Sequence, residues 1–404
     1  MANYQLTRLA HRSGRKLHLQ QLGIALCIVV LLSLAACSEQ PAASAIDQQA
    51  KQRDHAGELH LDLGPLQNLV NAQSRKSIIF AEALRLSIER FLQTPDDTQH
   101  AQVQEAWLKA HSAYADLSSL PLPALVTVDS DIRLAAEHLL YQLDAWPIEP
   151  GYLDFLPAYP GSGLISDITV PMTPASMREQ HGFTDVQEVS MGFHALEYLL
   201  FARGLQEFQI ADYSVPDRQN DLKNEHIRAL QRVIILRRKD ALRIIAEQIN
   251  LDLASLFAMN GAGYTGLDND NMGGEKRAVL GLTLSIVQHL RQVALHAIDD
   301  NERLMTGDVG HGEYSATRQR LLAAALGSLQ LTLFEPVNLT ALVATNGTDT
   351  VDTLRKTLQE AKNNAGGKTT TADDSARLAL LLAALPHLLD DLARLISLTP
   401  KQQH

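Results

Sequence analysis

The sequence predicts an all-α protein made of two helical bundles packed side by side, after a cleaved lipoprotein signal peptide. Three observations lead to this fold class. An apolar run near the N-terminus ends at a cysteine, apolar residues recur at three- and four-residue spacing over most of the chain, and no segment shows sustained strand-like alternation. Long amphipathic helices with short connections favour packing of the four-helix-bundle type.

Residues 1–36 are expected to be the signal peptide. Basic residues come first, no acidic residue precedes position 39, and an apolar run then extends from Leu22 to Ala36. The run has 15 residues, whereas a bilayer-spanning helix needs roughly 20. Its end, Leu34-Ala35-Ala36-Cys37, resembles the bacterial lipobox. The resemblance implies cleavage before Cys37 and its lipidation, and anchoring at the periplasmic face of the outer membrane or at the surface of a Gram-negative cell. An ordinary signal peptide or a short membrane anchor, with a chance cysteine, is the alternative.

The expected mature chain is acidic and has no pair of thiols. Removal of four basic and no acidic residues changes the formal net charge from −11 to −15, which disfavours nucleic acid as a partner. Cys27 lies inside the signal peptide, so a disulfide framework and a cysteine-rich zinc site are both excluded. Residues 37–60 are polar and are expected to form a flexible tether between the lipid and the folded body.

Residues 61–210 are expected to form the N-terminal bundle. Apolar residues from Leu66 to Phe91 follow one stripe, which predicts a helix. The break at 94–97 supplies acidic residues to the start of a second helix through Trp107 and Tyr114.

A third helix is expected at about 128–144, followed by a Pro- and Gly-rich loop from Trp146 to Pro174. A loop of this length in a compact domain is often functional. Thr184 and Gln187 are spaced as a capping box, which predicts that a fourth helix starts there.

Residues 211–404 are expected to form the C-terminal bundle. The boundary is placed near 205–220, where the apolar pattern is interrupted. Helical patterns then appear at about 221–257, 275–306, 314–333, 348–364 and 374–395, separated by Gly- or Asn-rich breaks. The basic cluster 237–239 in the first of these helices is expected to lie on a solvated face.

The segment from Gly192 to Phe201 holds the most informative residues of the chain. His194 and Glu197 are three positions apart, so a helix places them on one face, one turn from each other. Imidazole and carboxylate are both common metal ligands, and the pair could therefore share a cation. Gly192 lacks a side chain and would let another backbone or a ligand come close. The alternative is a buried pair that only satisfies its own hydrogen bonds.

The motif Gly192-Phe193-His194-Ala195-Leu196-Glu197 resembles the Gly-x-His-x-x-Glu signature of the imelysin family. The opening helix pair and the long loop with Trp146-Pro147 are also similar to those of the family, over about residues 65–205. The resemblance implies two helical bundles, export to the periplasm or cell surface, and a site between the bundles. The chain departs from the family pattern at His111, where an arginine is expected. It also departs in its second half, where Glu313-Tyr314-Ser315 is only a loose counterpart of the polar patch that the family has.

Three functions remain open at this point. The favoured one is metal binding linked to iron uptake, since the family includes iron-regulated and iron-uptake-associated proteins; His194 and Glu197 would hold a divalent or ferric ion, with iron favoured over zinc. Its partners would be the membrane, through the N-terminal lipid, and components of an iron-uptake transporter. The second is a metallopeptidase, as the family is catalogued, and the third is a structural or partner-binding bundle.

Further ligands would have to come from outside the motif. A zinc peptidase usually needs three protein ligands and a general base, and the sequence does not identify its catalytic residues. The candidates for a distant histidine ligand are His289, His296 and His311. The candidates in the segments before the motif are Glu137, His138, Asp144, Asp154 and Asp167.

Overall fold

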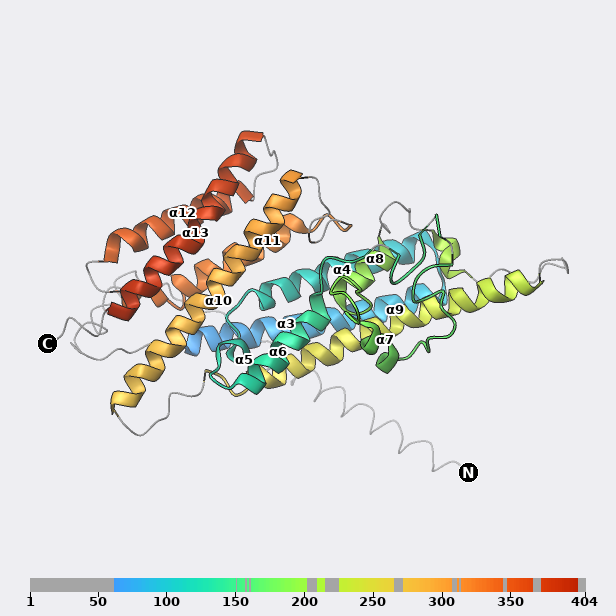
Figure 1. Ribbon diagram of the computed structural model, residues 1–404, viewed down its shortest axis with the longest axis horizontal. Coiled ribbons are helices and arrows are strands. Elements are labelled where there is room, and N and C mark those ends of the chain that lie inside the picture. The colour runs from blue at the N-terminus through green and yellow to red at the C-terminus, as the bar shows by residue number, and fades with distance from the viewer. Residues whose placement is uncertain are drawn as a thin grey trace, which may run out of the picture. The chain divides into compact units, whose positions relative to one another are not determined.

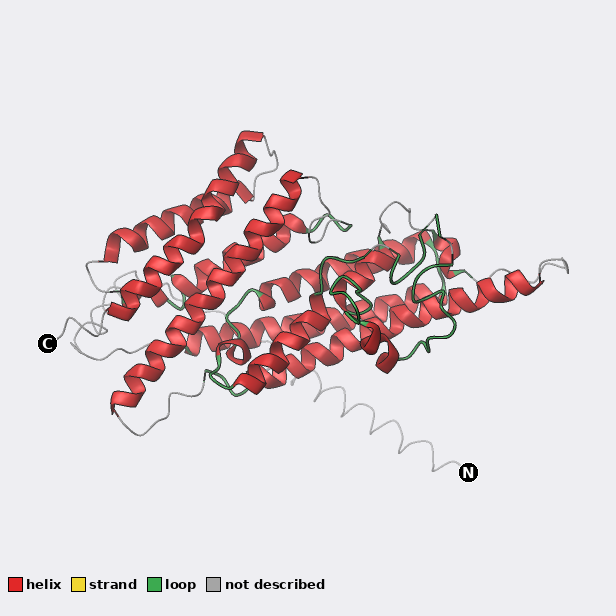
Figure 2. Ribbon diagram, in the orientation of Figure 1, coloured by secondary structure: helices red, strands yellow, loops and turns green. Residues whose placement is uncertain are grey.

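The computed structural model confirms the all-α fold class. It describes residues 62–398 except 150, 157, 160, 202–208, 215–224, 265–271, 307–310, 312–313, 344–346 and 366–371. Within these ranges the regular elements are all helical (Figures 1 and 2), and the one β-bridge joins Leu156 and Tyr159 in isolation. The expected signal peptide, Cys37 and the tether lie outside the described residues. By its contacts, the segment from Leu59 to His404 forms one compact unit.

Two long helices, α3 (Gly64–Gln93) and α4 (Asp97–Ser118), form the predicted hairpin at the start of this unit. The break between them falls where the sequence predicts it. Asp96 caps α4, since its side chain accepts a hydrogen bond of 2.7 Å from the backbone N–H of Gln99. The buried stripe of α4 includes Trp107, whose indole is fully covered. The short helix α5 (Pro123–Val126) and then α6 (Ser130–Asp144) follow.

The first bundle is completed by α9 (Glu225–Asn260), which the sequence analysis assigned to the second. This helix packs against α3, α6 and the motif helix α8 (Gly192–Leu200). Its apolar stripe, which includes Leu242 and Ile249, is buried in the shared core. The boundary predicted near 205–220 falls mostly on residues outside the described ones, and its described part holds the 3-10 turn η1 (Ile210–Tyr213), which packs against α9.

The second bundle consists of α10 (Met272–Thr306), α11 (Arg318–Leu333), α12 (Thr348–Ala365) and α13 (Ala372–Leu398), drawn in orange to red in Figure 1. In this group α13 packs against α10 and α12, and α11 packs against α12. A 3-10 turn, η3 (Leu339–Leu342), lies between α11 and α12. Contacts of α11 with α4 and of α10 with α5 join the two bundles, and Ser328 donates a hydrogen bond of 2.5 Å to the carbonyl of Ser119 across this junction.

Among the described residues, one helical segment, Ala278–Arg303 of α10, is long and apolar enough to cross a membrane by length and composition. The core helix of a water-soluble bundle meets the same criterion, and α10 contributes buried residues such as Ile286 and Leu290 to the core.

The long connection from Ala145 to Thr173, before the short helix α7 (Pro174–Gln180), is held to α9 by arginine side chains. Arg238 forms a bidentate ion pair with Asp154: its Nε and Nη2 atoms donate to the two carboxylate oxygens at 2.7 and 2.8 Å. Both side chains are almost completely buried. Burial opposes the charge of Arg238, but the Asp154 carboxylate raises its pKa above the ordinary value. Arg237 donates to the carbonyls of Ile165 and Asp167. The expectation that this basic cluster is solvated is therefore wrong, because its arginines anchor the loop.

Replacement of Asp154 by alanine should lower the free energy of unfolding by about 3–5 kcal/mol, because Arg238 would keep its charge in a buried place without a carboxylate. The measurement is denaturant unfolding followed by circular dichroism. Asp116→Ala is the control, since its ion pair with Lys76 is exposed and such pairs contribute about 0–1 kcal/mol. Equal effects of the two substitutions would contradict the structural role of Asp154.

Candidate metal centre

The motif helix α8 begins at Gly192, eight residues later than the capping box predicts. Thr184 does bond to an acidic partner, but the partner is Glu188, and the two residues form a turn instead of a helix start. Gly192 has a φ of +85°, and a Cβ there would lie 2.5 Å from the carbonyl oxygens of Gln142 and Leu143. The missing side chain therefore lets the end of α6 lie directly against the start of α8.

His194 and Glu197 lie on one face of α8, and both side chains are fully buried. The Nδ1 atom of His194 is 2.6 Å from Oε2 of Glu197, and the backbone N–H of Ser315 donates to Oε1 of the same carboxylate at 2.8 Å. Burial alone would raise the pKa of Glu197, but the hydrogen bonds from His194 and Ser315 hold it below the ordinary value. Both carboxylate oxygens of Glu197 therefore have hydrogen-bond partners, one in the imidazole of His194 and the other in the backbone of Ser315.

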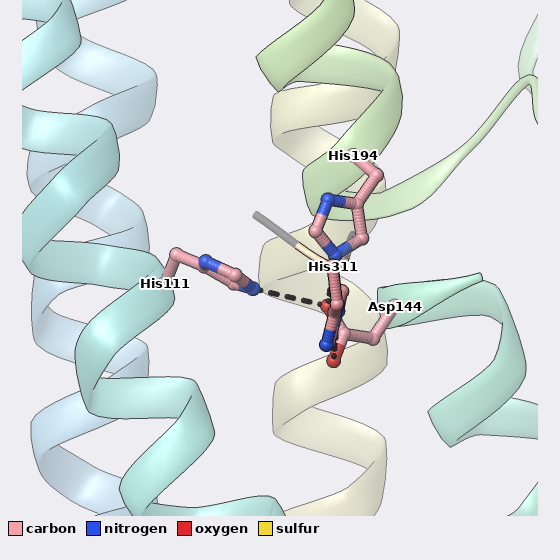
Figure 3. Close-up of side chains that lie close together, drawn as sticks. All are labelled: His111, Asp144, His194 and His311. Carbon is pink, nitrogen blue, oxygen red and sulfur yellow. Dashed lines mark hydrogen bonds and ion pairs between the residues drawn. The ribbon is translucent and has the colours of Figure 1, made fainter. Parts of the chain in front are cut away.

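The other ring nitrogen of His194 faces three side chains from other parts of the chain (Figure 3). These are His111 from α4, Asp144 from the last turn of α6, and His311 from the segment after α10. One ligand atom from each of the four residues lies within 4.8 Å of the others. We call these four residues, His111, Asp144, His194 and His311, the donor group.

The contacts inside the donor group are short. Oδ1 of Asp144 lies 3.1 Å from Nε2 of His111 and 3.1 Å from Nε2 of His194. The Nε2 atoms of His194 and His311 are 2.6 Å apart, and Nδ1 of His311 lies 3.7 Å from a carboxylate oxygen of Asp300. Trp146 covers the group, with its ring centroid 5.0 Å from that of His194.

Asp144 supplies the negative charge of the donor group. Burial opposes its ionisation, but His311 and the hydrogen bonds from the three imidazoles hold its pKa well below the ordinary value. Asp144 in turn changes the pKa of His311. Burial would lower its pKa, whereas Asp144 and Asp300 raise it to about 10. Burial lowers the pKa of His111 despite the bond to Asp144. The site thus attracts positive charge, which a proton or a metal ion can supply.

The donor set fits a transition-metal ion. Imidazole nitrogens suit zinc, copper, iron and nickel, and a carboxylate beside them suits iron and zinc in particular. A histidine that binds a metal usually gives its other ring N–H to a carboxylate, which fixes the tautomer and the ring orientation. Glu197 holds His194 in this way and leaves Nε2 to face the group. Protein metal sites of this kind combine an inner set of ligands with an outer set of orienting partners.

The structure brings together some of the sequence candidates and not others. His194, Asp144 and His311 belong to the donor group, while Glu197 contacts it through His194. The remaining candidates lie elsewhere: Glu137 pairs with Arg133, His138 is exposed, Asp154 pairs with Arg238, Asp167 bonds to Thr169, and His289 and His296 line a neighbouring cavity.

His111 was not among the candidates, because it stood out only as a departure from the family pattern. A local signal was present. Trp107 and His111 are four residues apart, so they share a helix face, and the Trp107 indole donates a hydrogen bond of 2.9 Å to the carbonyl of Phe193 in the motif helix. The face of α4 that carries His111 is therefore the face that packs against α8.

The donor group borders a cavity between the two bundles with a volume of about 960 Å³. Asp144, Trp146, Asp300 and His311 contribute to its wall, and most of the remaining wall comes from α4, α5, α6, α10 and α11. His111 and His194 are closed off from solvent, whereas the side chains of Asp144 and His311 are 17% and 19% exposed. A molecule from solvent would therefore reach the donor group through this cavity.

Comparisons with known proteins identify a family and similar folds. The sequence profile of the Imelysin family matches residues 76–392. A crystal structure described as an iron-regulated protein A precursor from Parabacteroides distasonis aligns with a TM-score of 0.55 at 12% identity, over 85% of this chain and 97% of that one. An imelysin-like protein from Psychrobacter arcticum aligns with a TM-score of 0.44 at 15% identity, over 83% and 91% of the two chains. No curated protein matches the chain.

Replacement of Gly192 by alanine should destabilise the protein by about 2–4 kcal/mol, because a side chain with positive φ costs about 1–2 kcal/mol and the Cβ would overlap backbone oxygens of α6. Thermal and denaturant unfolding measure this change. Gly281→Ala in α10 is the control: a Cβ there meets nothing within 4 Å, and alanine in a helix should add about 0.5–1 kcal/mol. A Gly192→Ala protein as stable as the parent would show that α8 does not need this close approach.

Proposed function

The chain belongs to the imelysin family, and from this premise and the site geometry we propose that it binds a metal ion at the donor group, with iron as the favoured cargo and zinc as the alternative. The observation that supports the proposal is the convergence of three imidazoles and one carboxylate, from four separate elements, on one point. A buried carboxylate and buried histidines at such distances need a compensating charge, and a cation with open coordination positions supplies it.

The link to iron rests on two further supports. The family resemblance is one, and the other is the aligned structure from Parabacteroides distasonis, which is described as an iron-regulated protein A precursor. We propose that the chain is exported, that Cys37 carries a lipid, and that the protein works at the periplasmic face of the outer membrane or at the cell surface. There it would pass iron to components of an uptake transporter.

In this proposal Glu197 positions His194 and does not bind the ion. Its two oxygens are taken by His194 and by the backbone N–H of Ser315. This arrangement also bears on the metallopeptidase alternative, which needs a general base free to act on a metal-bound water. Because Glu197 is engaged on both oxygens, we rank metal binding above peptide hydrolysis.

His194→Ala should weaken metal binding by more than about 100-fold, since the loss of a ligand exceeds the 10–100-fold effect of an orienting partner. Calorimetry with Zn²⁺, and with Fe²⁺ under anaerobic conditions, measures the affinity. His138→Ala is the control, because His138 is exposed on α6, the helix that carries Asp144. A parent protein without affinity for either ion would favour the purely structural role of the bundle.

Glu197→Gln should weaken metal binding by only about 10–100-fold, as expected for a residue that orients a ligand. The visible spectrum of the Co²⁺-loaded protein gives a second readout, since the coordination number should stay the same. If the substitution abolished binding as completely as His194→Ala and changed the Co²⁺ spectrum, Glu197 would itself be a ligand.

A further inference from the structure

The cavity beside the donor group can hold more than a metal ion, if the donor group binds one as proposed above. A cation held by the donor group would be shielded by His111 and His194 on one side and would face the cavity on the other. Four protein donors leave coordination positions open on an ion that takes six ligands, as many transition metals do. Whatever fills these positions must reach the ion through the cavity, past Asp144 and His311.

The cavity is much larger than a hydrated ion requires. At about 30 Å³ for each water, an ion with its first hydration shell occupies roughly 200 Å³, whereas the cavity has about 960 Å³. Sites for small organic molecules have volumes of about 300–1,000 Å³. The lining residues of α10 extend from Leu284 to Asn301, which corresponds to about 25 Å of helix. The donor group therefore lies at one end of a space that fits an organic molecule.

Two acidic residues of the wall, Glu137 and Asp299, have basic partners within the protein. Glu137 lies 4.0 Å from the guanidinium of Arg133, and Asp299 forms an ion pair of 3.0 Å with Arg303. Such pairs leave little net charge for a ligand to meet along this part of the wall. Shape and neutral hydrogen bonds are therefore expected to contribute to selectivity along this part of the wall.

The neutral part of the wall combines hydrogen-bonding and apolar groups. Gln288 and Gln292 of α10 lie one turn apart and offer amide donors and acceptors, while Leu321 and Leu322 of α11 offer aliphatic surface. His289 also lines the cavity, and burial lowers its pKa to about 4, so the ring is neutral at physiological pH. A wall of this kind suits a molecule with oxygen groups on a short carbon skeleton.

We propose that the cavity holds the organic part of a metal chelate, so that the ion is bound together with a small chelator that has carboxylate or hydroxamate oxygens. The ion exchanges some of its bound waters or chelator oxygens for the protein donors, and it keeps its remaining bonds to the chelator. The chelator fills the cavity along α10 and bonds to Gln288 and Gln292. No electron transfer is part of this step.

Equilibrium dialysis of the purified protein with Fe³⁺ and radiolabelled citrate, and in parallel with labelled acetohydroxamate, tests the proposal. We expect at least one of the two labels to be retained with the iron, at about one chelator for each protein, and not to be retained when iron is absent. Retention of iron without either label would overturn the inference and leave the proposed function standing. A failure to retain iron, together with no affinity for Zn²⁺ in the absence of chelator, would overturn both.

Gln292→Trp adds a spatial test, because it introduces bulk into the cavity wall about 12 Å along α10 from Asp300. Gln292 is exposed, so the indole can be accommodated without disruption of the core. We expect at least about tenfold less chelator retention through steric exclusion, with unchanged affinity for Zn²⁺ alone and an unchanged melting temperature. Ala323→Trp is the matched control, since Ala323 is exposed on α11 and does not line the cavity. Equal retention by the two tryptophan variants would contradict the proposal.

Discussion

The negative charge of the largely enclosed Asp144 is the constraint on which the arrangement of the site depends. A carboxylate removed from water is costly unless hydrogen bonds and opposite charge surround it. Here the imidazoles of His111, His194 and His311 surround the carboxylate, and each comes from a different segment of the chain. The positions of α4, α8 and the segment after α10 are thereby tied to one point at the end of α6.

The scaffold around this point is built so that backbones can meet closely. At Gly192 the start of α8 lies against the carbonyls that end α6, so His194 is carried to within reach of Asp144. The Asp154–Arg238 ion pair attaches the long loop between α6 and α8 to α9. The loop is therefore a fixed part of the first bundle, although it has almost no regular secondary structure.

Much of the fold follows from local patterns in the sequence. The break at Thr94 and the cap at Asp96 are readable because they depend on near neighbours, and the His194–Glu197 pair is readable because helix geometry fixes residues three apart. The packing of α9 against α3 and the position of His311 cannot be read from local patterns. Both depend on contacts between residues more than 100 positions apart. A histidine on an apolar helix face looks the same in a core as in a ligand set, and this explains why His111 was missed.

The position of His311 has a consequence for an incomplete chain. His111 and His311 are separated by 200 positions in the chain. Bringing such distant segments together lowers the conformational entropy of the chain, and the favourable free energy of packing in the bundles offsets this loss. A growing chain that has not yet reached α10 holds three of the donors but lacks the fourth, and it also lacks the Ser315 N–H that engages Glu197. The complete donor group therefore needs residues from before and after α10, and a chain that ends before His311 lacks it.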